Sequence, residues 1–232
     1  MSDTSNSTGN GDRRVGIVTG GTANLGKLFS ESLAGDGVDL VVHYNSPSRA
    51  DEAAETVAAL EELGVKAISH QGDLTDIKEI AKLVDATVER FGRWDILVNT
   101  SGLIVRKPLA ETSEEEFDRS FAINTKIPYF LMREAFDKMA DDGRIINMVT
   151  TQVAVTAATY SAYAGSKAPV EHFTKAFAKE IGGRGVTVNC IAPGPQKTSF
   201  FFDAETPDTI AWLSGMTING DLGEPVDVVP VM

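Results

Sequence analysis

Six short apolar runs, separated by stretches with helical periodicity, constrain the fold of this chain most. They span residues 15–19, 38–44, 65–70, 94–98, 144–150 and 185–192. Short runs rich in Val and Ile are typical of buried strands. Strands that alternate with helices predict an α/β fold, a doubly wound parallel sheet flanked by helices in a single domain, with right-handed crossovers.

The length and composition support one large domain. The chain has 232 residues, of which 42% are hydrophobic, enough for a sizeable core. We expect the domain to span residues 13–232. The polar segment 1–12, rich in Gly, Ser and Asn, is expected to be a disordered leader without the apolar core of a signal peptide.

The charge and the cysteine count limit the partners and the compartment. The net charge of −12 argues against nucleic acid or an anionic membrane, because both select basic surfaces. Cys190 is the only cysteine, so no internal disulfide can form, and we expect a reducing, cytoplasmic location. His43, His70 and His172 are too scattered to predict a zinc site, so no metal is expected.

A glycine-rich turn follows the first predicted strand. Residues 20–26 read Gly-Gly-Thr-Ala-Asn-Leu-Gly and open a helical pattern. Glycines let the backbone approach a ligand, and a helix N-terminus supplies N–H groups and the positive end of a dipole. Many such turns contain glycine for turn geometry only, but the position at the start of an alternating chain favours a phosphate cradle.

The end of the second predicted strand bears on which dinucleotide would bind. In such folds an acidic residue here binds the adenosine ribose and repels a 2′-phosphate. Residues 44–49 read Tyr-Asn-Ser-Pro-Ser-Arg, with no carboxylate before Asp51. Hydroxyls, an amide and Arg49 favour NADP(H), while NAD(H) stays possible. The alternative is an ordinary loop in which Ser48 caps the next helix, predicted over residues 50–63.

A tyrosine and a lysine four residues apart are the strongest candidates for chemistry. Tyr163 and Lys167 would share one face of a predicted helix that runs to about Ile181. An ammonium near a phenol lowers the phenol pKa from about 10 toward neutrality, which suits proton transfer. Thr150 ends the fifth strand and would bring a hydroxyl close. Alternatively, the pair is an ordinary feature of a surface helix.

Three further polar residues are candidates for a functional or a structural role: Asn124, Asp73 and Asp76. A capping box at 113–116 predicts the start of a helix that carries Asn124 among apolar neighbours. Asn124 is either functional or a core asparagine with satisfied hydrogen bonds. Asp73, after the third strand, can accept from an adenine amino group. Asp76 is more simply an acid at the start of a helix.

Taken together, in this order and spacing, these motifs resemble the short-chain dehydrogenase/reductase family in its compact single-domain form, over residues 14 to the end. The resemblance implies a Rossmann-like fold. It implies that Tyr163 is the general acid/base and that Lys167 holds the nicotinamide ribose and lowers the tyrosine pKa. It also implies that Thr150 orients the substrate oxygen and that Asn124 supports a water in a proton relay to Lys167.

The resemblance also implies the reaction. The protein would transfer a hydride between NADP(H) and a carbonyl or secondary alcohol, in the EC 1.1.1.- group, as a homodimer or homotetramer. The residues assigned to the cofactor are Gly20, Thr22, Asn24, Leu25, Tyr44, Asn45, Ser46, Asp73, Leu74, Asn99, Ser101, Gly102, Tyr163, Lys167, Pro193, Gly194 and Thr198.

Two other functions stay open on this scaffold. Halohydrin-cleaving lyases usually carry arginine in place of the lysine and lose the nucleotide site. Catalytically silent nucleotide-binding regulators typically lose the tyrosine or the lysine. Because this chain keeps the glycine turn, Tyr163 and Lys167, the enzyme hypothesis is favoured.

The chain departs from the family pattern at several places. Asn24 replaces a glycine, and we expect it to adopt left-handed backbone and to cap the next helix. Thr150 replaces serine, and residues 99–102 read Asn-Thr-Ser-Gly in place of Asn-Asn-Ala-Gly. In the family, a stretch like 223–227 opens a helix that is followed by a last strand, and neither follows here. Either the sequence omits a segment or the protein is short, and a missing edge strand would expose a sheet edge and could weaken a tetramer contact.

The sequence also predicts which residues would surround the substrate. An apolar cluster at 199–202 is expected in a loop, and Thr206 followed by Pro207 predicts a helix start. The residues predicted to shape the pocket suggest that it is partly apolar, without identifying the substrate; they are Gln152, Val153, Tyr160, Phe200, Phe201 and Trp212.

Overall fold

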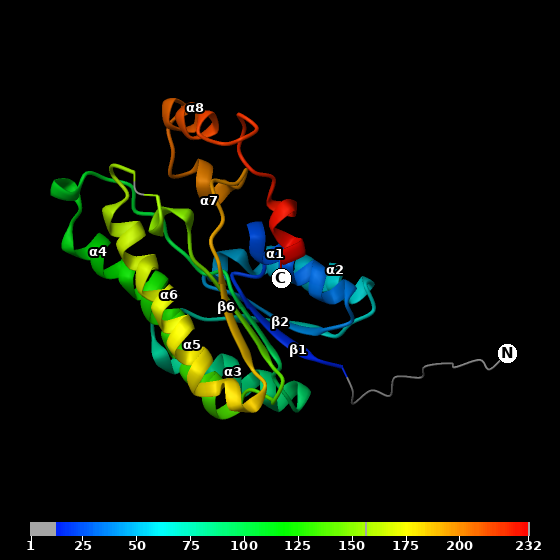
Figure 1. Cartoon of the computed structure of the whole chain (residues 1–232). Helices are drawn as coiled ribbons and strands as arrows, with labels where there is room; N and C mark the ends of the chain where they lie inside the picture. The colour runs from blue at the N-terminus through cyan, green and yellow to red at the C-terminus, as the bar shows by residue number, and fades with distance from the viewer. Residues whose placement is uncertain (1–12, 156, 232) are drawn as a thin grey trace.

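One parallel sheet organises the chain (Figure 1). The structure, a computed structural model, describes residues 13–155 and 157–231, so the predicted leader lies outside the described residues. The strand order is β3-β2-β1-β4-β5-β6, which reverses between β1 and β4. The strands are β1 (Val15–Thr19), β2 (Asp39–Tyr44), β3 (Ala67–Gln71), β4 (Ile96–Asn99), β5 (Arg144–Met148) and β6 (Thr187–Ile191). The predicted fold class is confirmed, and the strand bounds shift by only one or two residues.

Helices cover both faces of the sheet, as Figure 1 shows. One layer holds α1 (Asn24–Gly35) and α2 (Ala50–Glu62). The other holds α3 (Ile77–Phe91), α4 (Glu114–Phe121), α5 (Ile127–Lys138) and α6 (Ser161–Ile181). Two short helices, α7 (Ser199–Phe202) and α8 (Pro207–Gly215), stand above the carboxyl ends of the strands.

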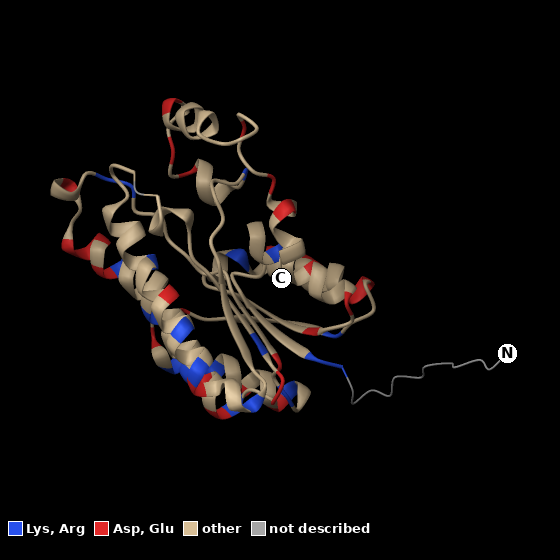
Figure 2. Cartoon of the chain, in the orientation of Figure 1, with Lys and Arg blue, Asp and Glu red and all other residues tan. Residues whose placement is uncertain are grey.

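The pleat of the strands divides the core between the two layers. Because successive side chains point to opposite faces, Ile17 packs with Leu97 in the layer of α3, α5 and α6. Its neighbour Val18 packs with Phe29 in the layer of α1 and α2. A sheet covered on both faces explains the unbroken apolar runs. Figure 2 shows the charged residues on the outer surfaces of the helices and the sheet almost free of them.

Local sequence signals set most helix ends. Ser113 and Glu116 form the predicted capping box of α4. Thr206 caps α8, with Pro207 as its first residue. Asp76 caps α3 by accepting a hydrogen bond of 2.9 Å from the backbone N–H of Lys78. The segment 199–202, expected in a loop, is instead helical because the Thr198 hydroxyl accepts from the Phe201 N–H and starts a turn there.

The outer edge of β6 is one of the two edges of the sheet. β6 pairs with β5, and within residues 13–155 and 157–231 no strand lies on its outer edge. The segment Pro225–Val231 forms a 3-10 helix that packs against α1 rather than against this edge, with Val228 buried.

Two kinds of feature are absent from residues 13–155 and 157–231. None of the helices is both long and apolar enough for a bilayer crossing. In the same residues, no group of three or more His, Cys, Asp or Glu side chains is placed to hold a metal ion.

The buried centre of the sheet should dominate stability. Leu97 in β4 is fully buried, whereas Leu109 is 77% exposed. We expect Leu97→Ala to lower the free energy of unfolding by about 2–5 kcal/mol, through lost burial and a residual cavity. The matched control Leu109→Ala should change it by less than about 0.5 kcal/mol. Urea denaturation followed by circular dichroism measures both, and equal effects would contradict the assignment of the core.

Candidate active site

One large pocket runs along the carboxyl ends of the strands. Its volume is about 1330 Å³, and it is lined by the glycine turn, the loops after β2 and β4, the start of α6 and the segment after β6. Every predicted site residue lines it except Asn99 and Asn124. Parallel strands open their carboxyl ends at the same edge, and a crevice forms where the strand order reverses. The sequence motifs therefore meet in space as predicted.

The glycine turn brings backbone close to backbone. Gly20 has φ +62°, in the left-handed region that favours glycine. A Cβ atom at Gly26 would lie 2.1 Å from the Gly20 carbonyl oxygen, so only glycine fits there. The first turn of α1 then forms part of the pocket wall. A tight glycine-containing turn that opens a helix fits a phosphate group.

Asn24 behaves partly as predicted. Its φ of +49° confirms the left-handed backbone. The predicted cap is wrong, because Asn24 is itself the first residue of α1, and Ala23 before it makes no side-chain cap. Asn24 Oδ1 instead accepts a hydrogen bond of 3.1 Å from the hydroxyl of Ser199, the first residue of α7. The amide thus joins the glycine turn to the segment after β6.

The loop after β2 carries a positive side chain at the pocket wall. Arg49 lines the pocket and lies 3.6 Å from the Glu52 carboxylate, with both side chains about half exposed. Ser46, not Ser48, caps the turn that follows β2, because its hydroxyl accepts from the Ser48 N–H. The alternative in which Ser48 caps the helix is therefore wrong. Asp73 lines the same end and accepts from the Thr75 hydroxyl at 2.8 Å.

His43 holds the glycine turn in place. The residue is buried, and burial lowers the pKa of its imidazole to about 4. Nδ1 lies 3.4 Å from the Gly20 N–H and accepts from it, so the ring proton sits on Nε2, which donates to the Gly72 carbonyl at 2.8 Å. The neutral His43 ring therefore joins the turn after β1 to the turn after β3.

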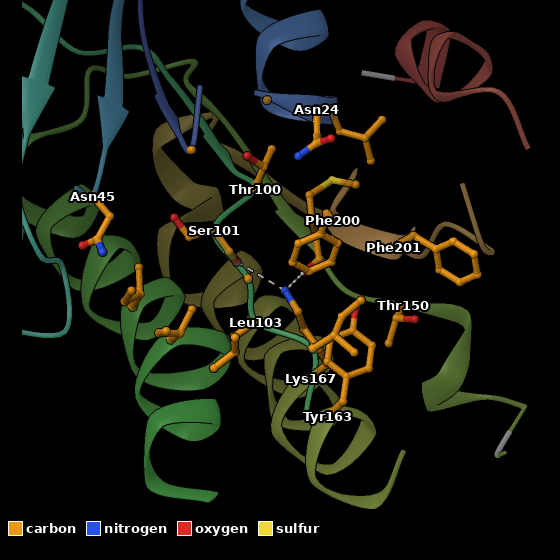
Figure 3. Close-up of a pocket in the computed structure, with 18 of the residues that line it drawn as sticks. Asn24, Asn45, Thr100, Ser101, Leu103, Thr150, Tyr163, Lys167, Phe200 and Phe201 are labelled. Atoms are coloured by element: carbon orange, nitrogen blue, oxygen red, sulfur yellow. Dashed lines mark hydrogen bonds between the residues drawn. The ribbon is translucent and has the colours of Figure 1, made fainter. Parts of the chain in front are cut away.

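Tyr163, Lys167 and Thr150 meet at the opposite end of the pocket (Figure 3). The four-residue spacing places both α6 side chains on one face, and both are almost fully buried. Lys167 Nζ donates to the Met148 carbonyl at 2.8 Å and lies 3.5 Å from the Ser101 carbonyl. The Thr150 hydroxyl makes a hydrogen bond with the Tyr163 phenol.

The expected fall of the tyrosine pKa is not found in this structure. Burial raises the pKa of Tyr163 to about 12, against a smaller lowering by the hydrogen bond with Thr150. Burial also lowers the pKa of Lys167 to about 8. The reason is physical: desolvation disfavours the charged form of both groups, and the Lys167 amine is directed to backbone carbonyls rather than to the phenol.

Asn124 lies behind the pocket wall in a π-helical turn, Ala122–Lys126. Its amide donates to the Leu103 carbonyl at 2.8 Å and to the Ser166 hydroxyl at 2.9 Å. Its oxygen accepts from the Leu103 N–H at 2.9 Å. Asn124 is therefore a satisfied buried asparagine that fixes the loop after β4. Asn99 is likewise buried behind the wall, and its oxygen accepts from the Thr19 hydroxyl at 2.7 Å.

The substrate end is partly as the sequence predicted. Gln152, Tyr160, Phe200 and Phe201 line the pocket, but Val153 and Trp212 do not. Leu213 takes the place expected for Trp212, which is 53% exposed, because the α8 helix turns the neighbouring side chain inward. Two further residues lie behind this wall without belonging to any sequence motif, Arg106 and Glu205.

Comparison with known proteins agrees with this geometry. The family model for short chain dehydrogenases matches residues 14–208. The chain therefore belongs to the short-chain dehydrogenase/reductase family, a family of oxidoreductases.

Individual relatives bear reductase and dehydrogenase names. The chain is 36% identical to the hydroxynaphthalene reductase-like protein Arp2 of Metarhizium brunneum, over 93% of this chain and 78% of that protein. It is 37% identical to an NADPH-dependent aldehyde reductase-like chloroplastic protein of Arabidopsis thaliana, over 94% and 86%. A crystal structure of a putative dehydrogenase from Burkholderia cenocepacia with bound NADP is 42% identical, with a TM-score of 0.88 over 94% and 85% of the two chains.

The buried His43 makes a specific acid sensitivity. Its pKa is about 6.5 when unfolded and about 4 when folded. The unfolded chain binds the proton first as the pH falls, so the stability linked to His43 is complete above pH 6.5 and is lost toward pH 4. At about 1.4 kcal/mol per pKa unit, the loss is about 3 kcal/mol. Urea unfolding at several pH values should show it.

The control substitutions separate this effect from general acid denaturation. His43→Gln removes the titrating group, so the variant should lose less stability than the wild type between pH 6.5 and pH 4. The control is His172→Gln, at an exposed position on α6, which should keep the wild-type pH dependence. The same slope in all three proteins would contradict the role of His43.

Proposed function

We propose that this protein is an NADP(H)-dependent oxidoreductase that interconverts a carbonyl compound and a secondary alcohol, in the EC 1.1.1.- group. The observation that carries the proposal is one pocket with a glycine cradle at one end and Tyr163, Thr150 and Lys167 at the other. Reductase-named relatives and an NADP-bound structural neighbour support it.

The residues along the pocket fit the cofactor. The turn that begins at Gly20 would hold the pyrophosphate at the start of α1. Arg49 and the hydroxyl and amide groups of residues 44–48 would hold a 2′-phosphate. Asp73 would meet the adenine, and Lys167 the nicotinamide ribose. Pro193, Gly194 and Thr198 would lie along the nicotinamide, and NADPH would supply the hydride.

The chain itself would supply the proton. Because burial keeps the pKa of Tyr163 near 12, the phenol is protonated at neutral pH and can donate from Oη to a carbonyl oxygen. The Thr150 hydroxyl, in contact with that phenol, would orient the same oxygen. Lys167 ties the start of α6 to the end of β5 through its hydrogen bond to the Met148 carbonyl. Burial of these groups excludes water from the reacting atoms.

We propose that residues 13–232 form one NAD(P)-binding domain, which works in the cytoplasm as a homodimer or homotetramer. Asn124, which fixes the loop after β4, would also support a water in a proton relay to Lys167. The substrate would be a small carbonyl compound or alcohol.

Loss of the phenol proton should remove turnover. We expect Tyr163→Phe to lower kcat for carbonyl reduction by about 10²–10⁴-fold, the usual contribution of a positioned proton donor. The rate of NADPH oxidation with a panel of ketones and aldehydes measures it. NADPH affinity should stay within about threefold, since the aromatic ring remains. Wild-type NADPH oxidation in the variant would refute the proposed mechanism.

Nucleotide preference is the second test. Titration with NADPH and NADH, followed by nucleotide fluorescence, should show tighter binding of NADPH. Arg49→Ala should weaken NADPH by about tenfold, roughly one charge-assisted hydrogen bond, and leave NADH unchanged. Lys179→Ala, an exposed position at the far end of α6, is the control.

The outcomes of this titration separate the hypotheses. Tighter NADH binding would overturn the assignment of the loop after β2 and leave the enzyme hypothesis intact. Tight NADPH binding without turnover on any carbonyl would favour the catalytically silent regulator. Halide release without added nucleotide would favour the lyase.

A further inference from the structure

A buried carboxylate joins three separate parts of the chain behind the substrate end of the pocket. Glu205, between α7 and α8, has a side chain that is 0% exposed. Its Oε1 accepts a hydrogen bond from the phenol of Tyr160, which precedes α6. Its Oε2 accepts from the Thr209 hydroxyl at 2.7 Å and lies 3.2 Å from Arg106 Nε, in the segment between β4 and α4.

The junction holds one positive and one negative side chain, Arg106 and Glu205, and both are largely buried. The Arg106 side chain is 19% exposed, and its Nε is not aligned for a hydrogen bond, so its contact with Glu205 is an ion pair. The Arg106 guanidinium also lies 5.8 Å from the centre of the Tyr160 ring. A buried ion pair is a weak source of stability, but removal of one partner leaves an uncompensated charge. The junction therefore fixes geometry more than it adds stability.

Tyr160 is the part of this junction that reaches the pocket. Its ring lines the pocket, whereas Glu205 and Arg106 do not. The ring centre lies 6.3 Å from that of Tyr163, at an angle of 57° between the ring planes. Because Glu205 engages the phenol oxygen, the hydroxyl is directed away from the substrate space and the ring forms the wall.

The surrounding wall is apolar as well. Phe200, Phe201 and Leu213 line the same end, and Figure 3 shows the Phe200 ring projecting toward Lys167. Phe201 and Leu213 are buried together with Leu222. A flat apolar ligand in contact with these rings buries apolar surface and can adopt the offset-stacked or edge-to-face geometry that aromatic pairs favour. A small polar ligand gains little from such a wall.

We propose that Glu205 is a positioning residue that turns the Tyr160 ring, not its hydroxyl, toward the substrate, and so selects carbonyl compounds with a flat, apolar body. This inference rests on the proposed function and names its substrate class. Glu205 acts through Tyr160, with Arg106 as its counter-ion. Without the carboxylate, the Tyr160 hydroxyl loses its acceptor and is free to turn into the pocket.

The test compares two ketones of opposite character, 2-tetralone, which is flat and aromatic, and acetoin, which is small and polar. Isothermal titration calorimetry with the NADP⁺-saturated protein gives their dissociation constants, independently of turnover. Glu205→Ala should raise the dissociation constant of 2-tetralone by about tenfold, roughly the loss of one good contact. Acetoin and NADPH affinities should change by less than about twofold.

Matched variants separate positioning from loss of structure. Tyr160→Phe keeps the ring and removes only the hydroxyl, so 2-tetralone binding should stay within about threefold of wild type. Glu205→Gln keeps an acceptor for the Tyr160 hydroxyl but leaves the Arg106 charge unpaired, so it should weaken 2-tetralone binding less than Glu205→Ala does. The double variant Arg106→Met with Glu205→Gln removes both charges and should recover most of that loss, as a double-mutant cycle detects.

Steady-state kinetics provides the second readout. In Glu205→Ala, KM for 2-tetralone should rise with little change in kcat, because Tyr163 and Lys167 are untouched. Unchanged 2-tetralone affinity, equal weakening of both ketones and NADPH, or no 2-tetralone binding to the wild type would overturn the inference. Wild-type protein that binds 2-tetralone but reduces neither ketone would contradict the proposed function instead.

Discussion

The contact between the first turn of α1 and the end of β1 is the constraint on which the rest of the site depends. Gly26 lies so close to the Gly20 carbonyl that no side chain fits between them. The same strand end is tied to β4, because the Thr19 hydroxyl donates to the Asn99 side chain and accepts from the Ser101 N–H at 3.2 Å. Strand, turn and helix are thus locked at the point where the sheet order reverses.

The catalytic end is governed by burial rather than by the proximity of opposite charges. Tyr163 and Lys167 both lose hydration. Burial raises the pKa of the phenol and lowers the pKa of the amine, so the neutral form of each group is favoured. The Tyr163 phenol therefore holds its proton more firmly than a free tyrosine does, whereas the Lys167 ammonium releases its proton more readily than a free lysine does. Thr150 and the Met148 carbonyl set where these groups point.

Features that depend on neighbouring residues could be predicted from the sequence. The strands, the capping box at Ser113, the helix start at Thr206 and the left-handed Asn24 all follow from local chemistry. The meeting of the loops in one pocket follows from parallel topology. Family resemblance supplied the roles of Tyr163 and Lys167, which spacing alone left open.

Features that depend on distant residues could not be predicted. The Asn24 amide contacts Ser199 instead of capping its own helix, a partnership 175 residues apart in sequence. The junction of Arg106 and Glu205 belongs to no motif, because its members lie in unrelated loops. The direction of the Tyr163 pKa shift was also missed, since the degree of burial is a property of the assembled fold.

The hydrogen bond between Asn24 and Ser199 has a thermodynamic consequence. It spans from the phosphate cradle to α7, whose Phe200 and Phe201 line the substrate end. A ligand that displaces the Asn24 side chain from Ser199 would change the freedom of α7. By reciprocity, a ligand that orders α7 alters the affinity of the cradle by the same factor. One amide in place of a glycine hydrogen thereby makes the two ends of the pocket energetically interdependent.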